Sequence, residues 1–349
     1  MPDNTVHCHC RDGGTTAFRW NHRRIMCPRA CPSPGTASIR RRTRPRACAK
    51  PPRCETAVQS SVEHWEGHPV EVVRLPASKP RHTALVLPGN PGVAAWYTDY
   101  AVALREQLPD DVEVVVAGFA GHYIEAALST RRAFVLDEQI RCLTDLLARL
   151  PATRSVVLVG HSIGAHIALQ LLSAHSSLTG VVGLYPFLRY APSQRVLAWL
   201  VACKPLVELV AGVAALLQRL PRSALLFLLQ PFFALLGGLG AAAQRVTAAW
   251  VRAASIRNVC VLGHSEFQAL AAQPDWSLIT DARVRLFYGP ADDMWAPSAD
   301  ADEAEGRGAR VTRDGSFGHM FCVLPEGSHH VARATSRLIA ELIAARKDR

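Results

Sequence analysis

The chain has 349 residues, of which 49% are hydrophobic, and its formal net charge is +10 at pH 7. This length suffices for one large enzyme domain with an appendage. The charge is unevenly distributed. Residues 1–60 hold 12 basic and 3 acidic residues, whereas residues 61–349 hold 27 and 26. A nearly neutral folded part argues against a basic binding face, so we expect no nucleic acid partner.

Residues 1–60 form a basic stretch that contains six of the ten cysteines and seven of the 23 prolines. Because apolar periodicity is missing, we interpret it as a disordered N-terminal extension. Arg-rich, acid-poor composition is also typical of organelle targeting segments, and that interpretation stays open. Residues 7–10 read HCHC and are followed by Cys27 and Cys31, but paired C-x-x-C spacing is absent. We therefore expect no metal and no cofactor.

From residue 61 onwards, strand-like and helix-like segments alternate. This order predicts an α/β domain over residues 61–349, with a mostly parallel central sheet and helices on both faces. The segments are listed here in chain order: strands at 70–75 (an edge strand), 83–87, 112–117, 156–159, 181–185, 284–288 and 309–312, and helices at 133–150 and 332–345.

The most informative stretch is residues 156–164, which read VVLVGHSIG. An apolar run enters a G-x-S-x-G pentapeptide, and residues 165–172 continue as an apolar helix. This strand–turn–helix context is that of a nucleophile elbow, in which Gly160 and Gly164 avoid collisions and Ser162 occupies a strained turn. A serine in an ordinary turn of a nucleotide-binding fold is the alternative. Together with the sheet, the motif predicts an α/β-hydrolase fold with Ser162 as nucleophile.

In an α/β-hydrolase the acid and the histidine follow the nucleophile along the chain. The strand at 284–288 is followed by Asp292 and Asp293, where the acid that orients the histidine is expected. Spacing from Gly289 favours Asp292, whereas spacing to Trp295 and Pro297 favours Asp293. We predict Asp293, and Asp292 remains the alternative.

A histidine base is expected in the loop before the last helix. His319 lies there, in the sequence DGSFGHMF at residues 314–321. A carboxylate fixes the imidazole tautomer, and the imidazole accepts the Ser162 proton, so that acyl transfer proceeds through an acyl-enzyme. A turn-forming aspartate and a solvent-facing loop histidine are the bland alternatives for these two positions.

An oxyanion hole requires two N–H donors. The residue after the nucleophile, Ile163, should supply one. The loop after residue 87 should supply the other, and Asn90 is placed best because Pro91 has no N–H. A second G-H-S sequence at residues 263–265 lacks the following glycine and a strand-to-helix transition. We interpret this second sequence as helix surface.

Several further segments complete the pattern around the elbow. They are LPGNPG at 87–92, WY at 96–97, AGH at 120–122, LDEQI at 136–140, the acid loop at 288–297 and His319. Together with the elbow at 160–164, they resemble the lipid droplet-associated hydrolase family. The resemblance covers about residues 65–345 and leaves the basic N-terminus unexplained. The family's acid loop has an Asp two residues before a Trp, but this chain has one extra residue after Gly289, which leaves the acid uncertain.

Residues 187–274 stand where hydrolases of this fold insert a cap. Residues 205–217 are apolar apart from Glu208, and residues 223–243 carry no charge. This apolar run approaches the length needed to span a bilayer. However, prolines at 205, 221 and 231 predict short helices joined by bends. Basic residues bracket the apolar pieces at 204, 219, 222 and 245. They suit a lipid headgroup surface.

We therefore expect a monotopic hairpin that enters one leaflet or the droplet monolayer, in agreement with what the resemblance implies. The alternative is a cap whose apolar side chains face an acyl pocket. The leading hypothesis is a serine hydrolase that cleaves lipid esters, such as sterol esters or acylglycerols, at the lipid droplet or endoplasmic reticulum surface. Two alternatives are a droplet-coating protein with little turnover and a soluble esterase for small esters.

Overall fold

The computed structural model describes residues 5–9, 15–19, 57–125, 128 and 132–347. The chain divides into two compact units, Met1–Ala57 and Val58–Arg349. In the first unit, β1 (Thr5–His9) and β2 (Thr15–Arg19) pair antiparallel, where the sequence predicted a disordered extension. The rest of that extension lies outside the described residues, as do the side chains of the HCHC cluster, Cys27 and Cys31.

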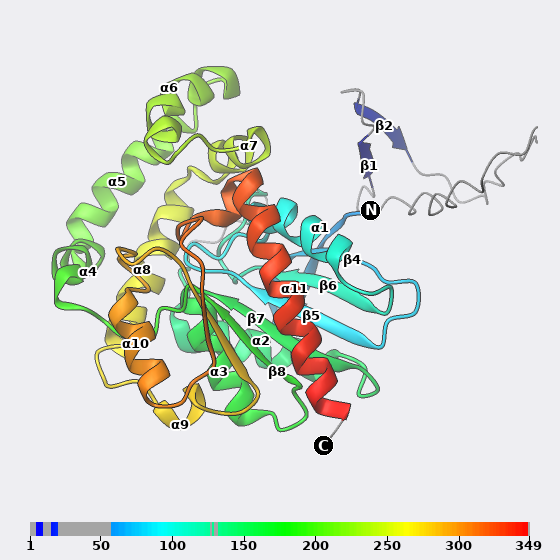
Figure 1. Ribbon diagram of the computed structural model, residues 1–349. Coiled ribbons are helices and arrows are strands. Elements are labelled where there is room, and N and C mark those ends of the chain that lie inside the picture. The colour runs from blue at the N-terminus through cyan, green and yellow to red at the C-terminus, as the bar shows by residue number, and fades with distance from the viewer. Residues whose placement is uncertain (1–4, 10–14, 20–56, 126–127, 129–131, 348–349) are drawn as a thin grey trace, which may run out of the picture. The chain divides into compact units, whose positions relative to one another are not determined.

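The second unit is built on an eight-stranded sheet with the order β10-β9-β8-β7-β5-β6-β4-β3 (Figure 1). The strands span Gln59–Trp65 (β3), His68–Leu75 (β4), His82–Leu87 (β5), Val112–Ala117 (β6), Ser155–His161 (β7), Gly180–Leu184 (β8), Val284–Tyr288 (β9) and Val311–Arg313 (β10). Strands β5 to β10 run parallel, whereas β4 is antiparallel to both of its neighbours. The predicted mostly parallel sheet is confirmed.

One strand position differs from the prediction. The segment predicted as an edge strand became β4, which lies between β6 and β3. The edge strand is β3, which the sequence analysis missed. Its residues are almost all exposed or half-buried, and its sequence, QSSVEHW, is largely polar. An edge strand with little burial carries a weak hydrophobic pattern, and this explains the omission.

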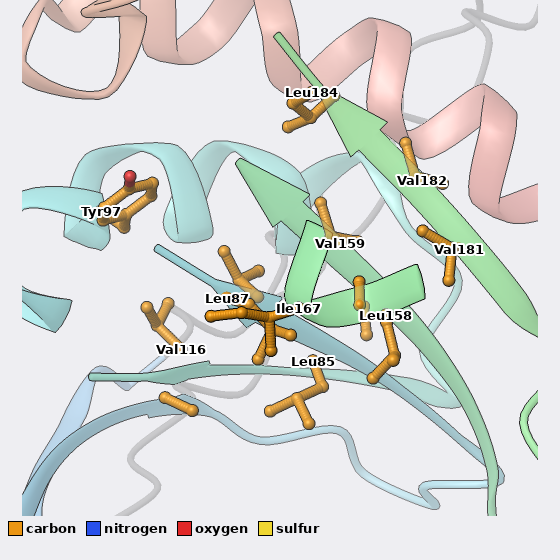
Figure 2. Packing of buried hydrophobic residues seen from close by; sticks show 14 of the residues in the cluster. Leu85, Leu87, Tyr97, Val116, Leu158, Val159, Ile167, Val181, Val182 and Leu184 are labelled. Atoms are coloured by element: carbon orange, nitrogen blue, oxygen red, sulfur yellow. The ribbon is translucent and has the colours of Figure 1, made fainter. Parts of the chain in front are cut away.

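Helices cover both faces of the sheet, as predicted. On one face α1 (Thr98–Gln107) packs against α11 (Pro325–Lys347), and on the other α2 (Leu136–Arg149) contacts α3 (Ile163–Ala174) (Figure 1). Figure 2 shows how Ile167 of α3 lies among Leu85 and Leu87 of β5 and Leu158 and Val159 of β7, all of them buried. Parallel strands covered on both faces are apolar along their whole length, and this made them recognisable in the sequence.

The predicted insertion consists of helices joined by bends. They are α4 (Arg195–Ala202), α5 (Lys204–Leu217), α6 (Arg222–Leu235), α7 (Ala241–Trp250) and α8 (Ala253–Ala269), followed by α9 (Trp276–Ile279). Helices α4 to α6 extend away from the sheet (Figure 1). In the described residues no single helix is long and apolar enough to cross a membrane. By length and composition alone, the bent pair 192–202 and 204–217, which meets at 69°, passes the same test.

Candidate active site

Ser162 stands at the junction of β7 and α3 in a strained backbone conformation. Its φ is 54° and its ψ −123°, in the left-handed half of the map that non-glycine residues rarely occupy. The backbone around it is tied down, because its N–H donates to Leu184 O (3.0 Å) and its carbonyl accepts from Phe187 N–H (3.2 Å). The turn therefore holds the Ser162 hydroxyl at a fixed point beyond the C-terminal end of β7.

The two elbow glycines are required because any side chain at these positions would collide with the backbone, as predicted. A Cβ on Gly160 would lie 2.2 Å from Gly164 O, and one on Gly164 would lie 2.4 Å from Leu87 O at the end of β5. Real Cβ atoms do not approach oxygen so closely. The elbow, the helix behind it and the neighbouring strand therefore pack together only with glycine at both positions.

Asp293 and His319 meet across the loops that follow β9 and β10. His319 Nδ1 lies 3.2 Å from Asp293 Oδ2, and the other carboxylate oxygen accepts the N–H groups of Trp295 (2.8 Å) and Ala296 (3.0 Å). Burial alone would raise the pKa of Asp293, but these hydrogen bonds outweigh it and lower the pKa below its ordinary value. Asp293 therefore stays ionised, whereas Asp292 is exposed.

The imidazole of His319 is held within a cluster of aromatic rings. The His161 ring lies 4.7 Å from it and the Tyr185 ring 5.8 Å, between ring centroids. Tyr185 also donates its hydroxyl to Phe317 O (2.8 Å) in the His319 loop. His161 immediately precedes Ser162, so His319 lies beside the elbow. In the described part of the chain, no hydrogen bond joins the Ser162 hydroxyl to His319. Such bonds are often long before substrate binds.

Of the two predicted oxyanion donors, Ile163 directly follows Ser162, and Asn90 follows Gly89, where a Cβ would lie 2.9 Å from Ser162 Cβ. Ile163 begins α3, so its N–H has no acceptor within the helix. On the facing loop, the Gly89 N–H donates to the Tyr97 hydroxyl (2.8 Å), which contacts His161 Nδ1 (2.6 Å). The Gly89 N–H is therefore already hydrogen-bonded, whereas the Asn90 N–H makes no hydrogen bond to any described residue. Tyr97 was missed as a site residue, although it belongs to the WY pair noted in the sequence.

The second G-H-S sequence is helical, as predicted, but it is not an exposed surface, because Gly263 is buried and His264 and Ser265 are half-buried. It lies in α8, where Gly263 and Glu266 are buried and the Ser265 hydroxyl accepts from Leu136 N–H (2.9 Å). Gly263 faces Asn90, because a Cβ on it would lie 3.4 Å from Asn90 Nδ2. The error arose because α8 is covered by elements distant in sequence. This cover could not be seen from α8 alone.

The site is nearly enclosed. Ser162 is 8% exposed, and the side chains of Asp293 and His319 are 3% and 17% exposed. No group of three or more His, Cys, Asp or Glu side chains that could hold a metal ion occurs among the residues for which the structure is described. The arrangement is suited to nucleophilic chemistry by a serine beside an imidazole–carboxylate pair.

Sequence comparison places these features in a family. The family model described as lipid-droplet associated hydrolase matches residues 80–322. A lipid droplet-associated hydrolase of Drosophila melanogaster is 35% identical over 102 residues, which cover 26% of this chain and 33% of the relative. The Gallus gallus relative of the same name is 27% identical over 241 residues, 64% of this chain and 74% of the relative. In the Drosophila match, the chain thus spans about a third of the relative's length.

The fold has solved counterparts. The haloalkane dehalogenase DbeA of Bradyrhizobium elkani superposes with a TM-score of 0.59 and 15% identity, covering 82% of this chain and 99% of that one. At this identity the likeness concerns the fold alone, and it confirms the predicted α/β-hydrolase architecture. With a family match that extends over most of the second unit, the chain belongs to the lipid-droplet associated hydrolase family.

Proposed function

We propose that this protein is a serine ester hydrolase acting at the surface of lipid droplets, with Ser162, Asp293 and His319 as its catalytic triad. The observation that carries the proposal is the juxtaposition of the strained Ser162 turn with the Asp293–His319 hydrogen bond, in the chain order expected for this fold. A buried carboxylate on Nδ1 leaves Nε2 as the acceptor for the serine proton.

The proposed reaction follows from these positions. The Ser162 hydroxyl transfers its proton to His319 Nε2 as its oxygen attacks the ester carbonyl. The N–H groups of Ile163 and Asn90 stabilise the resulting oxyanion. His319 then protonates the departing alcohol, and the acyl group remains on Ser162. A water molecule, activated by the same imidazole, releases the carboxylic acid and restores the serine.

The exposed apolar side chains of the insertion support a lipid surface as the site of action. Eleven of the fifteen large hydrophobic residues that are exposed among the described residues lie in α4 to α6 and the α5–α6 turn. They are Val196, Trp199, Leu209, Val210, Val213, Leu216, Leu220, Phe227, Leu228, Phe232 and Leu235. We call this set the apolar face. A concentrated apolar area is typical of membrane or partner contact, and it favours the anchor over a cap that only covers an acyl pocket.

Substrate class follows from this placement. An enzyme whose insertion carries such an apolar face meets esters that partition into lipid, so sterol esters and acylglycerols are the proposed substrates. The same face suits the droplet monolayer and the cytosolic leaflet of the endoplasmic reticulum, because a monotopic helix pair needs only one leaflet. The names of the relatives, lipid droplet-associated hydrolases, support the droplet.

The nucleophile is tested with a fluorophosphonate probe. Wild-type protein is expected to react at one serine, and Ser162→Ala to lose the label. Ser173→Ala, on the exposed side of the same helix, is the matched control and should retain it. A folded wild-type protein that does not react would refute the hydrolase.

The assignment of Asp293 as the triad acid is tested by comparing Asp293→Asn with Asp292→Asn. Loss of the carboxylate that orients His319 should lower the labelling rate by about 10³–10⁴-fold, whereas Asp292→Asn should leave it unchanged. The reverse result would assign the role to Asp292.

One observation favours a second function. Ser162 is almost inaccessible while the apolar face is fully open, which also suits a droplet-coating protein with little turnover. Fatty acid release from emulsified sterol esters and acylglycerols separates the two. A labelled but non-hydrolysing wild type would favour the coating function.

A further inference from the structure

One face of α8 contacts the side chain of Asn90, the residue whose N–H is a proposed oxyanion donor. Asn90 Nδ2 donates to Val259 O (3.1 Å). Gly263 lies one turn further along α8, and a Cβ on it would be 3.4 Å from the same nitrogen. Glu266 comes three residues after Gly263, and the Asn90 amide lowers the pKa of its carboxyl group, as a neighbouring N–H donor does. Positions 259, 263 and 266 lie on one face of a helix.

Two oxygen atoms at this contact have no donor. Asn90 Oδ1 and Glu266 Oε1 are both buried without a hydrogen-bond partner. The bond from Asn90 Nδ2 to Val259 O fixes which end of the amide faces the helix backbone. A buried acceptor without a donor destabilises the fold. A proton on the Glu266 carboxyl group would satisfy both oxygens at once.

The surroundings keep that proton in place. Glu266 is 5% exposed, and burial raises its pKa from 4.5 to about 8, against the lowering effect of the hydrogen bond with Asn90. A buried carboxylate without a cation is strongly disfavoured. At neutral pH the side chain is therefore a neutral donor.

Helices α2, α4 and α5 pack against α8. The titratable groups on these helices and on α8 are Asp137, Glu138, Arg141, Cys142, Asp145, Arg149, Arg195, Lys204, Glu208, Arg257, Cys260 and His264, with Cys203 between α4 and α5. Glu208 pairs with Arg257, and Asp145 pairs with Arg149. Burial raises the pKa of Glu266 and the Asn90 amide lowers it, and none of these charges shifts it.

We propose that Glu266 is a positioning residue whose neutral carboxyl group donates to Asn90 Oδ1 and so holds the Asn90 N–H in the oxyanion hole. The inference rests on the proposed function for its catalytic consequence, whereas the hydrogen bond itself can be tested without catalysis. Deprotonation would place a negative charge against the Asn90 carbonyl oxygen. The loop would then keep only the bond from Asn90 Nδ2 to Val259 O, and the oxyanion donor would move.

The hydrogen bond is tested by stability. Free energies of unfolding are measured in urea for wild type, Glu266→Leu, Asn90→Ala and the double variant. We expect the double variant to lose less than the sum of the single losses, because the two side chains share one bond. Additive losses would overturn the proposal.

The protonation of Glu266 is tested by measuring the free energy of unfolding in urea as a function of pH, with Glu266→Gln as the reference. The folded protein holds the Glu266 proton more tightly than the unfolded chain does, so its stabilising effect is complete below pH 4.5. The difference between wild type and Glu266→Gln should decline from there to about pH 8 and then level off. A difference that does not change with pH would overturn the proposal.

The consequence for the site is tested by the rate of fluorophosphonate labelling between pH 6 and 9. Glu266→Leu should label about tenfold more slowly than Glu266→Gln at each pH, since a misplaced oxyanion donor is one of the larger losses available to such a site. Glu266→Gln, which can still donate, should label at the wild-type rate at pH 7. Relative to Glu266→Gln, the wild type should slow above about pH 8.

Gln268→Glu, exposed on the same helix, is the matched control and should follow wild type. Equal labelling by folded Glu266→Leu and wild type would overturn the positioning role. If wild type does not label at any pH, the hydrolase proposal fails, and the two stability measurements alone decide on the hydrogen bond.

Discussion

Helices α3 and α5 are both strongly apolar, yet the protein buries one and exposes the other. Eight of the twelve residues of α3 are buried, whereas α5 buries only Ala211 and Ala214 of its fourteen. Helix α3 follows β7 and lies on a sheet that covers it. Helix α5 belongs to the insertion, and α4 and α8 cover only one side of it. The hydropathy of a helix therefore measures how much surface it could bury, and its position in the fold decides whether the protein buries that surface.

The largest expected difference between α3 and α5 is in the stability lost when an apolar side chain is truncated. Ile167→Ala in α3, a fully buried position, should lower the free energy of unfolding by about 2–5 kcal/mol. Leu209→Ala in α5, at a side chain 66% exposed, should change it by less than about 0.5 kcal/mol. Urea unfolding measures both. Flotation with lipid droplets should give the opposite result. Folded Leu209→Ala should bind droplets more weakly than wild type, whereas folded Ile167→Ala should bind as wild type does. Equal destabilisation by the two changes would refute the contrast.

The glycines of the same helices offer a smaller, sharper test. Gly164→Ala places a methyl group 2.4 Å from Leu87 O, and we expect a cost of about 1–3 kcal/mol together with loss of fluorophosphonate labelling. Nothing lies within 4 Å of a Cβ on Gly212 in α5, so Gly212→Ala should stabilise its helix by about 0.5–1 kcal/mol. Thermal unfolding and labelling measure the two effects. A damaging Gly212→Ala would mean that α5 is packed against another surface.

Charge at the end of α5 should have the smallest effect. Arg219, in the turn between α5 and α6, and Arg222, the first residue of α6, are both exposed. Replacing each with Gln should weaken binding to vesicles that contain anionic lipid by about 1 kcal/mol per residue, and salt should reduce the difference. Arg337→Gln, exposed on α11, is the control. If all three changes weaken binding equally, the apolar face does not orient the protein at the surface.

Much of the core could be predicted because its information is local. The bounds of β6 and β9 match the prediction, since a buried parallel strand is a short continuous apolar run. The elbow was equally clear, because its glycines lie within two residues of Ser162. The prolines predicted breaks in the insertion, and Pro205 and Pro221 stand at the starts of α5 and α6. Pro231 differs, because α6 continues through it.

What could not be predicted depends on contacts between distant residues. Asn90 meets Val259 across 169 positions of sequence, so the role of α8 is not visible in its own residues. Edge strand β3 has too little burial to leave a pattern. The choice between Asp292 and Asp293 depended on which side chain turns inward, and spacing alone gave no answer. Asp293 is the one that contacts His319.

The apolar face has a consequence for how much of this protein a cell contains. A copy without a lipid surface presents Trp199, Phe227 and Leu235, each more than 60% exposed, to the surrounding water. Chaperones and proteases recognise such surfaces on unfolded chains. Molecules in excess of the available lipid would then be aggregated or degraded. We therefore expect the abundance of the protein to follow the stored lipid surface even at constant synthesis.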